Sequence, residues 1–203
     1  MNPVQISLIL DTWVNRNVSE FCNVEDTSDA TPHCAHFVAH VLNLSRPGGR
    51  YLMGVPQIAQ LSPNFHPLRF PDHPCTAAGS LAMPWETGLI WVTSHGGFHV
   101  NEARRCFAIT ESENRHVGFY DRGRVWHYEN HPSDEQVVSY YLGRSPHDVV
   151  FRRFYNRYGP NCDLWLSDFP PGHWPRRFSE SEVPQGVDMR LERNFPGIRF
   201  PPR

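Results

Sequence analysis

Apolar residues recur at helical spacing near the start of the chain. Within residues 3–21 the apolar positions lie on one side of a helix: Ile6, Ile9, Leu10, Trp13, Val14 and Phe21. Asn2 is a suitable N-cap, and Pro3 suits the first helical position. The spacing therefore predicts one amphipathic helix over this stretch.

A second helical pattern occupies "TPHCAHFVAHVLNL", residues 31–44. Its apolar stripe consists of Phe37, Val38, Val41 and Leu42. Thr31 can cap this helix, Pro32 can take its first position, and "SRPGG" stops it. Cys34 then lies in the first helical turn. Residues 50–86 are rich in Pro, His and Gly, and beyond a short helical turn at "VPQIAQL" we expect an irregular segment there.

From residue 88 onward the pattern changes to short alternating runs bounded by turn residues, which is typical of β-strands. These runs are residues 88–94, 105–110, 115–121, 124–130, 136–142 and 148–155. The order of elements predicts an α+β fold with N-terminal helices packed on an antiparallel sheet. We place this domain at residues 1–160. Residues 161–203 carry repeated Pro, Arg and aromatic residues, typical of an extension that wraps the domain or is partly disordered.

Length and charge narrow the function classes. At 203 residues and 39% hydrophobic content the chain is long enough for one core. A net charge of −2 gives no general attraction to nucleic acid or to an anionic membrane. The N-terminus has no positive charge before its short apolar run, and no stretch has the length of a membrane span, so we expect neither a signal peptide nor membrane insertion. The expected location at synthesis is the cytoplasm.

The five cysteines are odd in number, widely spaced and without a CxxC pair, which favours individual reduced thiols. For Cys34 two interpretations stand side by side. A cysteine in the first turn of a helix beside a histidine can become a reactive thiolate. A free cysteine is, however, more often a small buried apolar residue.

A base for such a thiol is offered by "HVGFYDRGRVWHYEN", residues 116–130, which has the pattern of a β-hairpin with a turn at residues 121–124. If Tyr120 faces Val125, then Gly118 faces His127, and His116 is a diagonal neighbour of His127 on the same sheet face. A one-residue change of register would move His127 to the other face.

Taken together, these segments resemble the NlpC/P60 and CHAP group of papain-like cysteine amidases and endopeptidases. The resemblance lies in "HCAHFVAHVL", "TGLIWVT", "HVGFY" and "VWHYEN", in that order over roughly residues 30–130. It departs from the group at His33, where NlpC/P60 members usually have Asp, at Thr87 in the "GDL"-like segment, and in the long cysteine-to-histidine interval. Permuted acyltransferases similar to lecithin:retinol acyltransferase share the cysteine helix, but there the histidine strand comes first.

The resemblance implies a papain-like fold and a site made of three residues. Cys34 matches the nucleophile, His116 the general base, and His127 the residue that orients the base. It further implies cleavage of amide bonds in peptidoglycan stem peptides. Because no signal sequence explains access to a cell wall, export or injection as an antibacterial effector fits this activity, with an inhibitor or immunity protein as a partner.

Other histidines offer competing sites. His36 and His40 are four residues apart and could form a zinc site with Cys34, but we expect both to face solvent, opposite Phe37 and Val41. His99 is a second candidate base. We therefore expect no metal and no cofactor. The remaining alternatives to an amidase are a non-catalytic module of the same fold, in which Cys34 is core, and an acyltransferase.

Overall fold

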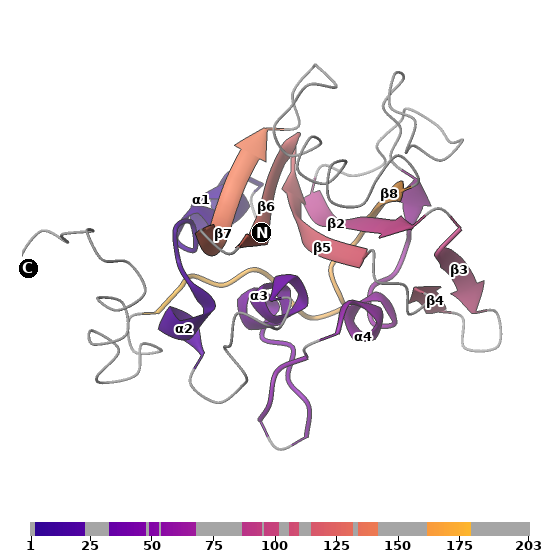
Figure 1. Cartoon of the computed structure of the whole chain (residues 1–203), viewed down its shortest axis with the longest axis horizontal. Helices are drawn as coiled ribbons and strands as arrows, with labels where there is room; N and C mark the ends of the chain where they lie inside the picture. Colours follow the sequence, from indigo (N-terminus) through magenta and orange to yellow (C-terminus); the bar gives the residue numbers. More distant parts are fainter. Residues whose placement is uncertain are drawn as a thin grey trace, which may run out of the picture.

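The computed structural model has an α+β architecture, in which a few helices cover one face of an antiparallel sheet (Figure 1). It describes residues 3–22, 33–47, 49–52, 54–67, 87–94, 96–101, 106–109, 115–131, 134–141 and 162–179. The coarse fold class predicted from the sequence is thereby confirmed. None of the helices in these ranges has the length and apolar character needed to cross a membrane.

The predicted N-terminal helix is two helices, α1 (Pro3–Asp11) and α2 (Val18–Phe21). The break contains Asn15 in the left-handed region, with φ of 63°. Asn17 then caps α2: its side chain accepts a hydrogen bond from the Ser19 N–H at 2.9 Å, and Glu20 accepts from the Asn17 N–H at 3.0 Å. This capping box begins a new helix at a point where the apolar spacing alone predicted an unbroken one.

The second predicted helix is α3 (Cys34–Leu42), and it is followed by the short α4 (Val55–Ala59). Asn43 ends α3 in the left-handed conformation, with φ of 55°, a few residues before the predicted "SRPGG" stop. All nine residues of α3 are buried. The helix is therefore covered on every side, and the prediction of a solvent-facing stripe with His36 and His40 is wrong.

Within the described part of the chain, six strands form the main sheet, in the order β1-β8-β2-β5-β6-β7, and all their pairings are antiparallel. Their bounds are β1 His66–Pro67, β2 Thr87–Ser94, β5 Arg115–Asp121, β6 Arg124–His131, β7 Asp134–Tyr141 and β8 Cys162–Ser167. A separate two-stranded sheet pairs β3 (Phe98–Asn101) with β4 (Cys106–Ile109). The strand predicted at residues 148–155 lies outside the described residues.

Strand β8 comes from the segment that the sequence assigned to the C-terminal extension. It lies between β1 and β2 and pairs with β2 from Leu89–Ser167 to Ser94–Cys162. After β8, residues 168–179 run past α3 towards α2, drawn in yellow in Figure 1. Trp13 Nε1 donates to the Arg176 carbonyl at 2.7 Å, and the Phe178 ring packs edge-on against Trp13 at 5.4 Å. This part of the extension wraps the helices.

The main core lies between the helices and one face of the sheet. Its sheet side chains alternate along the strands, and its helix side chains include large aromatic residues. The sheet contributes Leu89, Trp91, Val117, Phe119, Trp126 and Tyr128, and the helical layer contributes Trp13, Phe21 and Phe37.

Candidate functional site

Cys34 is the first residue of α3, with His33 as the N-cap. The N–H of Phe37 bonds the His33 carbonyl at 2.8 Å, so the preceding N–H groups of the first turn have no acceptor inside the helix. These groups and the helix dipole favour negative charge at this end. The Cys34 side chain is only 2% exposed and belongs to the main core. The predicted cap at Thr31 and Pro32 lies outside the described residues.

The hairpin that carries the candidate base has the predicted register. Tyr120 pairs with Val125, and Phe119 with Trp126. The two turn residues, Arg122 and Gly123, both have positive φ, 45° and 89°, as a tight two-residue hairpin turn requires.

Gly118 allows the two hairpin strands to approach closely beside His127. A Cβ at residue 118 would lie 2.6 Å from the Trp126 carbonyl oxygen and 3.0 Å from the His127 Cβ. The absence of a side chain at this position therefore has a steric cause.

His116 and His127 are brought together. Their rings are edge to face, with centroids 5.1 Å apart and an interplanar angle of 80°. Both side chains are buried, at 6% and 4% exposure. The Tyr140 ring of β7 lies 6.1 Å from the His127 ring, so it belongs to the same sheet face.

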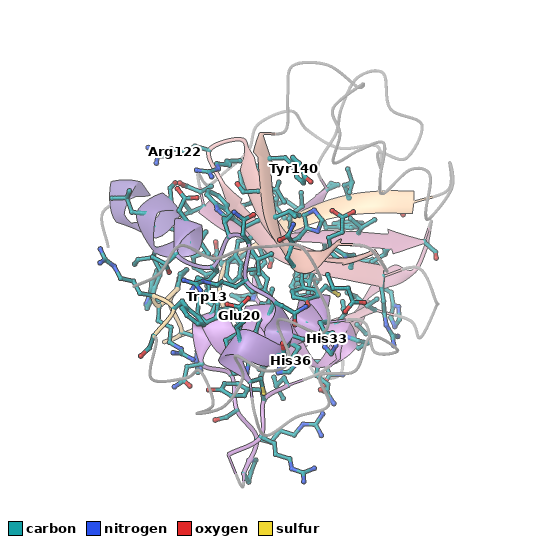
Figure 2. All side chains as sticks on the ribbon, turned by 60° about the vertical axis from the view of Figure 1, so that its left-hand side comes forward. Trp13, Glu20, His33, His36, Arg122 and Tyr140 are labelled. Carbon is teal, nitrogen blue, oxygen red and sulfur yellow. The ribbon has the colours of Figure 1, made fainter. Side chains whose placement is uncertain are left out.

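The helix α3 packs against the other face of these two strands. The Phe37 ring contacts the Phe119 ring at 5.4 Å, and His33 contacts Tyr128 at 5.6 Å. Because side chains alternate along a strand, His116 and His127 project away from the face that carries Phe119 and Tyr128. In Figure 2, His33 lies on the side of the sheet that faces the helices, and Tyr140 lies on the other side.

The backbone pairing of β5 with β6 covers only Phe119–Asp121 and Arg124–Trp126 among the described residues of these strands. This pairing ends before it reaches His116. On the other side of β5, His116 still pairs with Val92 of β2. The backbone pairing of β5 with β6 therefore ends next to the His116–His127 ring pair.

The second candidate base, His99, lies on β3 in the two-stranded sheet and is exposed. It belongs to a different sheet from His116 and His127. His95, from the same sequence segment, lies outside the described residues.

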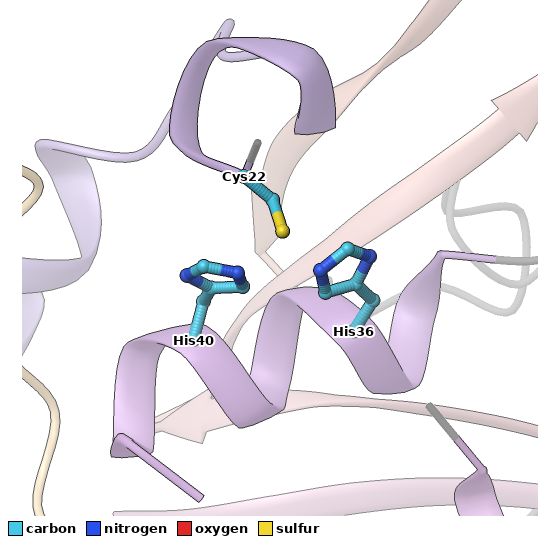
Figure 3. Close-up of side chains that lie close together, drawn as sticks. All are labelled: Cys22, His36 and His40. Atoms are coloured by element: carbon cyan, nitrogen blue, oxygen red, sulfur yellow. The ribbon is translucent and has the colours of Figure 1, made fainter. Parts of the chain in front are cut away.

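A second cysteine–histidine cluster was missed at the sequence level. Cys22, at the end of α2, lies beside His36 and His40 of α3, and their ligand-type atoms are all within 4.8 Å of one another (Figure 3). All three side chains are buried, at 4%, 0% and 2% exposure. The i, i+4 spacing of His36 and His40 did indicate a possible metal site. The sequence analysis combined these histidines with Cys34, whereas the structure places Cys22, from another helix, beside them.

Burial has a clear electrostatic effect on His40. Desolvation, followed by the neighbouring His36 and Arg176, lowers the pKa of His40 from 6.5 to about 2. Its imidazole is therefore neutral at physiological pH, which is the form that binds metal ions.

No family model, curated protein or solved structure matches this chain. The interpretation of both clusters therefore depends on their own chemistry and, for Cys34, on the sequence resemblance.

Proposed function

We propose that this chain is a cysteine-dependent amide hydrolase, with Cys34 as nucleophile, His116 as general base and His127 as the residue that orients His116. The observation that carries the proposal is the His116–His127 ring pair, which forms across Gly118 where the sequence predicted it. The strands of this pair are those on which the Cys34 helix packs.

The proposed reaction proceeds through a thioester. His116 accepts the thiol proton while Cys34 Sγ attacks the carbonyl carbon, giving a tetrahedral intermediate. The C–N bond then breaks, and His116 returns the proton to the leaving amine. His116 next takes a proton from water, whose oxygen attacks the thioester and releases the carboxylic acid and the thiol. The backbone N–H groups of the first turn of α3, which have no acceptor within the helix, supply hydrogen bonds to the oxyanion.

This mechanism makes one structural demand. The Cys34 thiol lies on the side of the sheet that carries Phe119, whereas the His116 and His127 rings lie on the opposite face of the sheet. Proton transfer between Cys34 and His116 therefore requires a change of conformation that brings the thiol and the imidazole to the same side of the sheet.

For the substrate we propose peptidoglycan stem peptides, on the strength of the sequence resemblance. In that role the protein is an antibacterial effector, delivered to a wall by export or injection and controlled by an inhibitor or immunity protein. A neutral charge balance, with a net charge of −2, suits a peptide substrate better than a polyanion.

A second candidate is a non-catalytic module of the same architecture. It is favoured by the 2% exposure of Cys34 and by the placement of the thiol and the ring pair on different faces. In such a module Cys34 is a packing residue.

The rate of alkylation of Cys34 by iodoacetamide at pH 7 separates the two candidates. A thiolate assisted by His116 reacts at least about tenfold faster than an ordinary thiol, and His116→Ala removes that advantage. His99→Ala, a change at an exposed histidine of the other sheet, is the matched control and leaves the rate unchanged. A slow Cys34 reaction that is equal in wild type and His116→Ala identifies the non-catalytic module.

A further inference from the structure

The Cys22–His36–His40 cluster has the donor set of a transition-metal site. His36 and His40 are one helical turn apart, so both rings project from the same side of α3. Cys22 approaches this side from the end of α2, and in Figure 3 the three side chains converge from two helices. A thiolate and two neutral imidazoles are preferred zinc ligands.

The rings are held in place by their neighbours. The His40 ring stacks on Tyr51, with centroids 3.6 Å apart, and meets the edge of Phe21 at 5.2 Å. His36 Nδ1 lies 3.4 Å from His33 Nδ1, which leaves Nε2 as the ligand atom of His36. A polar neighbour at the second ring nitrogen, as His33 is for His36, is a common feature of metal-ligating histidines.

His40 supplies an independent indication of a ligand. Its side chain is 2% exposed, and neither of its ring nitrogens has a hydrogen-bond partner in the described structure. A buried polar atom without a partner is costly, and most such atoms in native proteins are satisfied by a partner, a water or an ion. A metal ion bound by one of these nitrogens removes part of that cost.

We propose that Cys22 Sγ and one ring nitrogen each of His36 and His40 bind a Zn²⁺ ion. Binding displaces the thiol proton of Cys22 to solvent, so the bound ligand is the thiolate. Three protein ligands leave one position of the tetrahedron for a further donor.

The role of this ion is structural. Zinc peptidases with two histidines at this spacing use a glutamate next to the first histidine as the general base. The corresponding residue is Phe37, which is fully buried in the core. The site lacks that base, and the ion instead joins α2 to α3, the helix that begins with Cys34.

The test uses the purified full-length chain, stripped with a chelator and then titrated with Co²⁺ or Zn²⁺ alone. We expect one Co²⁺ per chain, with a thiolate-to-cobalt charge-transfer band and the intense visible absorption of a tetrahedral complex. Cys22→Ser loses the charge-transfer band. Cys34→Ser, which alters another buried cysteine, keeps it and is the matched control.

A measurement on the wild-type chain covers the case in which Cys22→Ser does not fold. Stoichiometric Zn²⁺ slows the alkylation of Cys22 at least about tenfold, because the metal-bound thiolate is withdrawn from reaction. Zn²⁺ also raises the melting temperature of the stripped protein. Equal alkylation of Cys22 with and without Zn²⁺, or a cobalt spectrum without thiolate character, overturns the proposal.

Discussion

The rings of His116 and His127 meet edge to face, with centroids 5.1 Å apart, on neighbouring strands of a tight hairpin. Gly118 makes this contact possible, because the carbonyl of Trp126 occupies the place where a side chain at residue 118 would lie. The pair is therefore a product of strand register and of one glycine, and both can be tested.

Gly118→Ala should lower the free energy of unfolding by about 1–3 kcal/mol, because its Cβ overlaps backbone that cannot move freely. It should also displace His127. Gly54→Ala is the matched control: its Cβ meets only the flexible Gln57 side chain at 3.3 Å, and the expected change stays within about 0.5 kcal/mol. Urea denaturation of the two variants measures the difference. Equal stabilities would contradict the close approach of Gly118 to the Trp126 carbonyl.

His116→Ala should reduce kcat/KM for amide hydrolysis by about 10²–10⁴-fold, the usual contribution of a general base. His127→Ala should reduce it less, because that residue acts on the base and not on the substrate. Steady-state assays on a stem-peptide substrate measure both variants. A larger loss for His127→Ala than for His116→Ala would contradict the assigned roles.

In metal-free protein, His40 should make the fold sensitive to acid. Its pKa is about 2 in the folded chain, below its ordinary 6.5. The unfolded chain therefore binds a proton below pH 6.5 that the folded chain does not, and stability is lost as the pH falls from 6.5 towards 2. The loss from one group is at most about 1.4 kcal/mol per pH unit. Denaturation of wild type and His40→Gln at several pH values with a chelator present should give a shallower acid decline for the variant. Parallel declines would contradict this.

Arg176→Ala should lower the free energy of unfolding by about 1–2 kcal/mol. The guanidinium Nε donates to the His40 carbonyl at 2.9 Å near the end of α3, and the group lies over the Trp13 ring at 5.7 Å. Arg177→Ala, at the exposed neighbouring position, is the control and should change stability little. Equal melting temperatures of the two variants would contradict a stabilising contact between Arg176 and α3.

Local patterns allowed much of the fold to be predicted. The alternation of residues 115–130 gave the hairpin, its turn and the register of Tyr120 with Val125, because strand periodicity and turn chemistry are encoded within a few residues. The helix of Cys34 was found from its apolar stripe. In both cases neighbouring residues determine the structure.

Long-range packing explains what the sequence did not show. Residues 162–167 become β8 only because β2 offers a free side for pairing, and the proline-rich surroundings concealed this. His36 and His40 were expected at the surface, but α2 and residues 168–179 cover that side of α3. Cys22 joins them from another helix, so no local spacing could identify it.

The most direct test of the central claim, that Cys34 is a nucleophile, is digestion of purified peptidoglycan by wild type, Cys34→Ala and His99→Ala, with the released fragments identified by mass spectrometry. The proposal predicts that wild type and His99→Ala release the same fragments with new amine and carboxyl ends, and that Cys34→Ala releases none. Equal release by Cys34→Ala would contradict the nucleophile, and no release by wild type would contradict the proposed substrate.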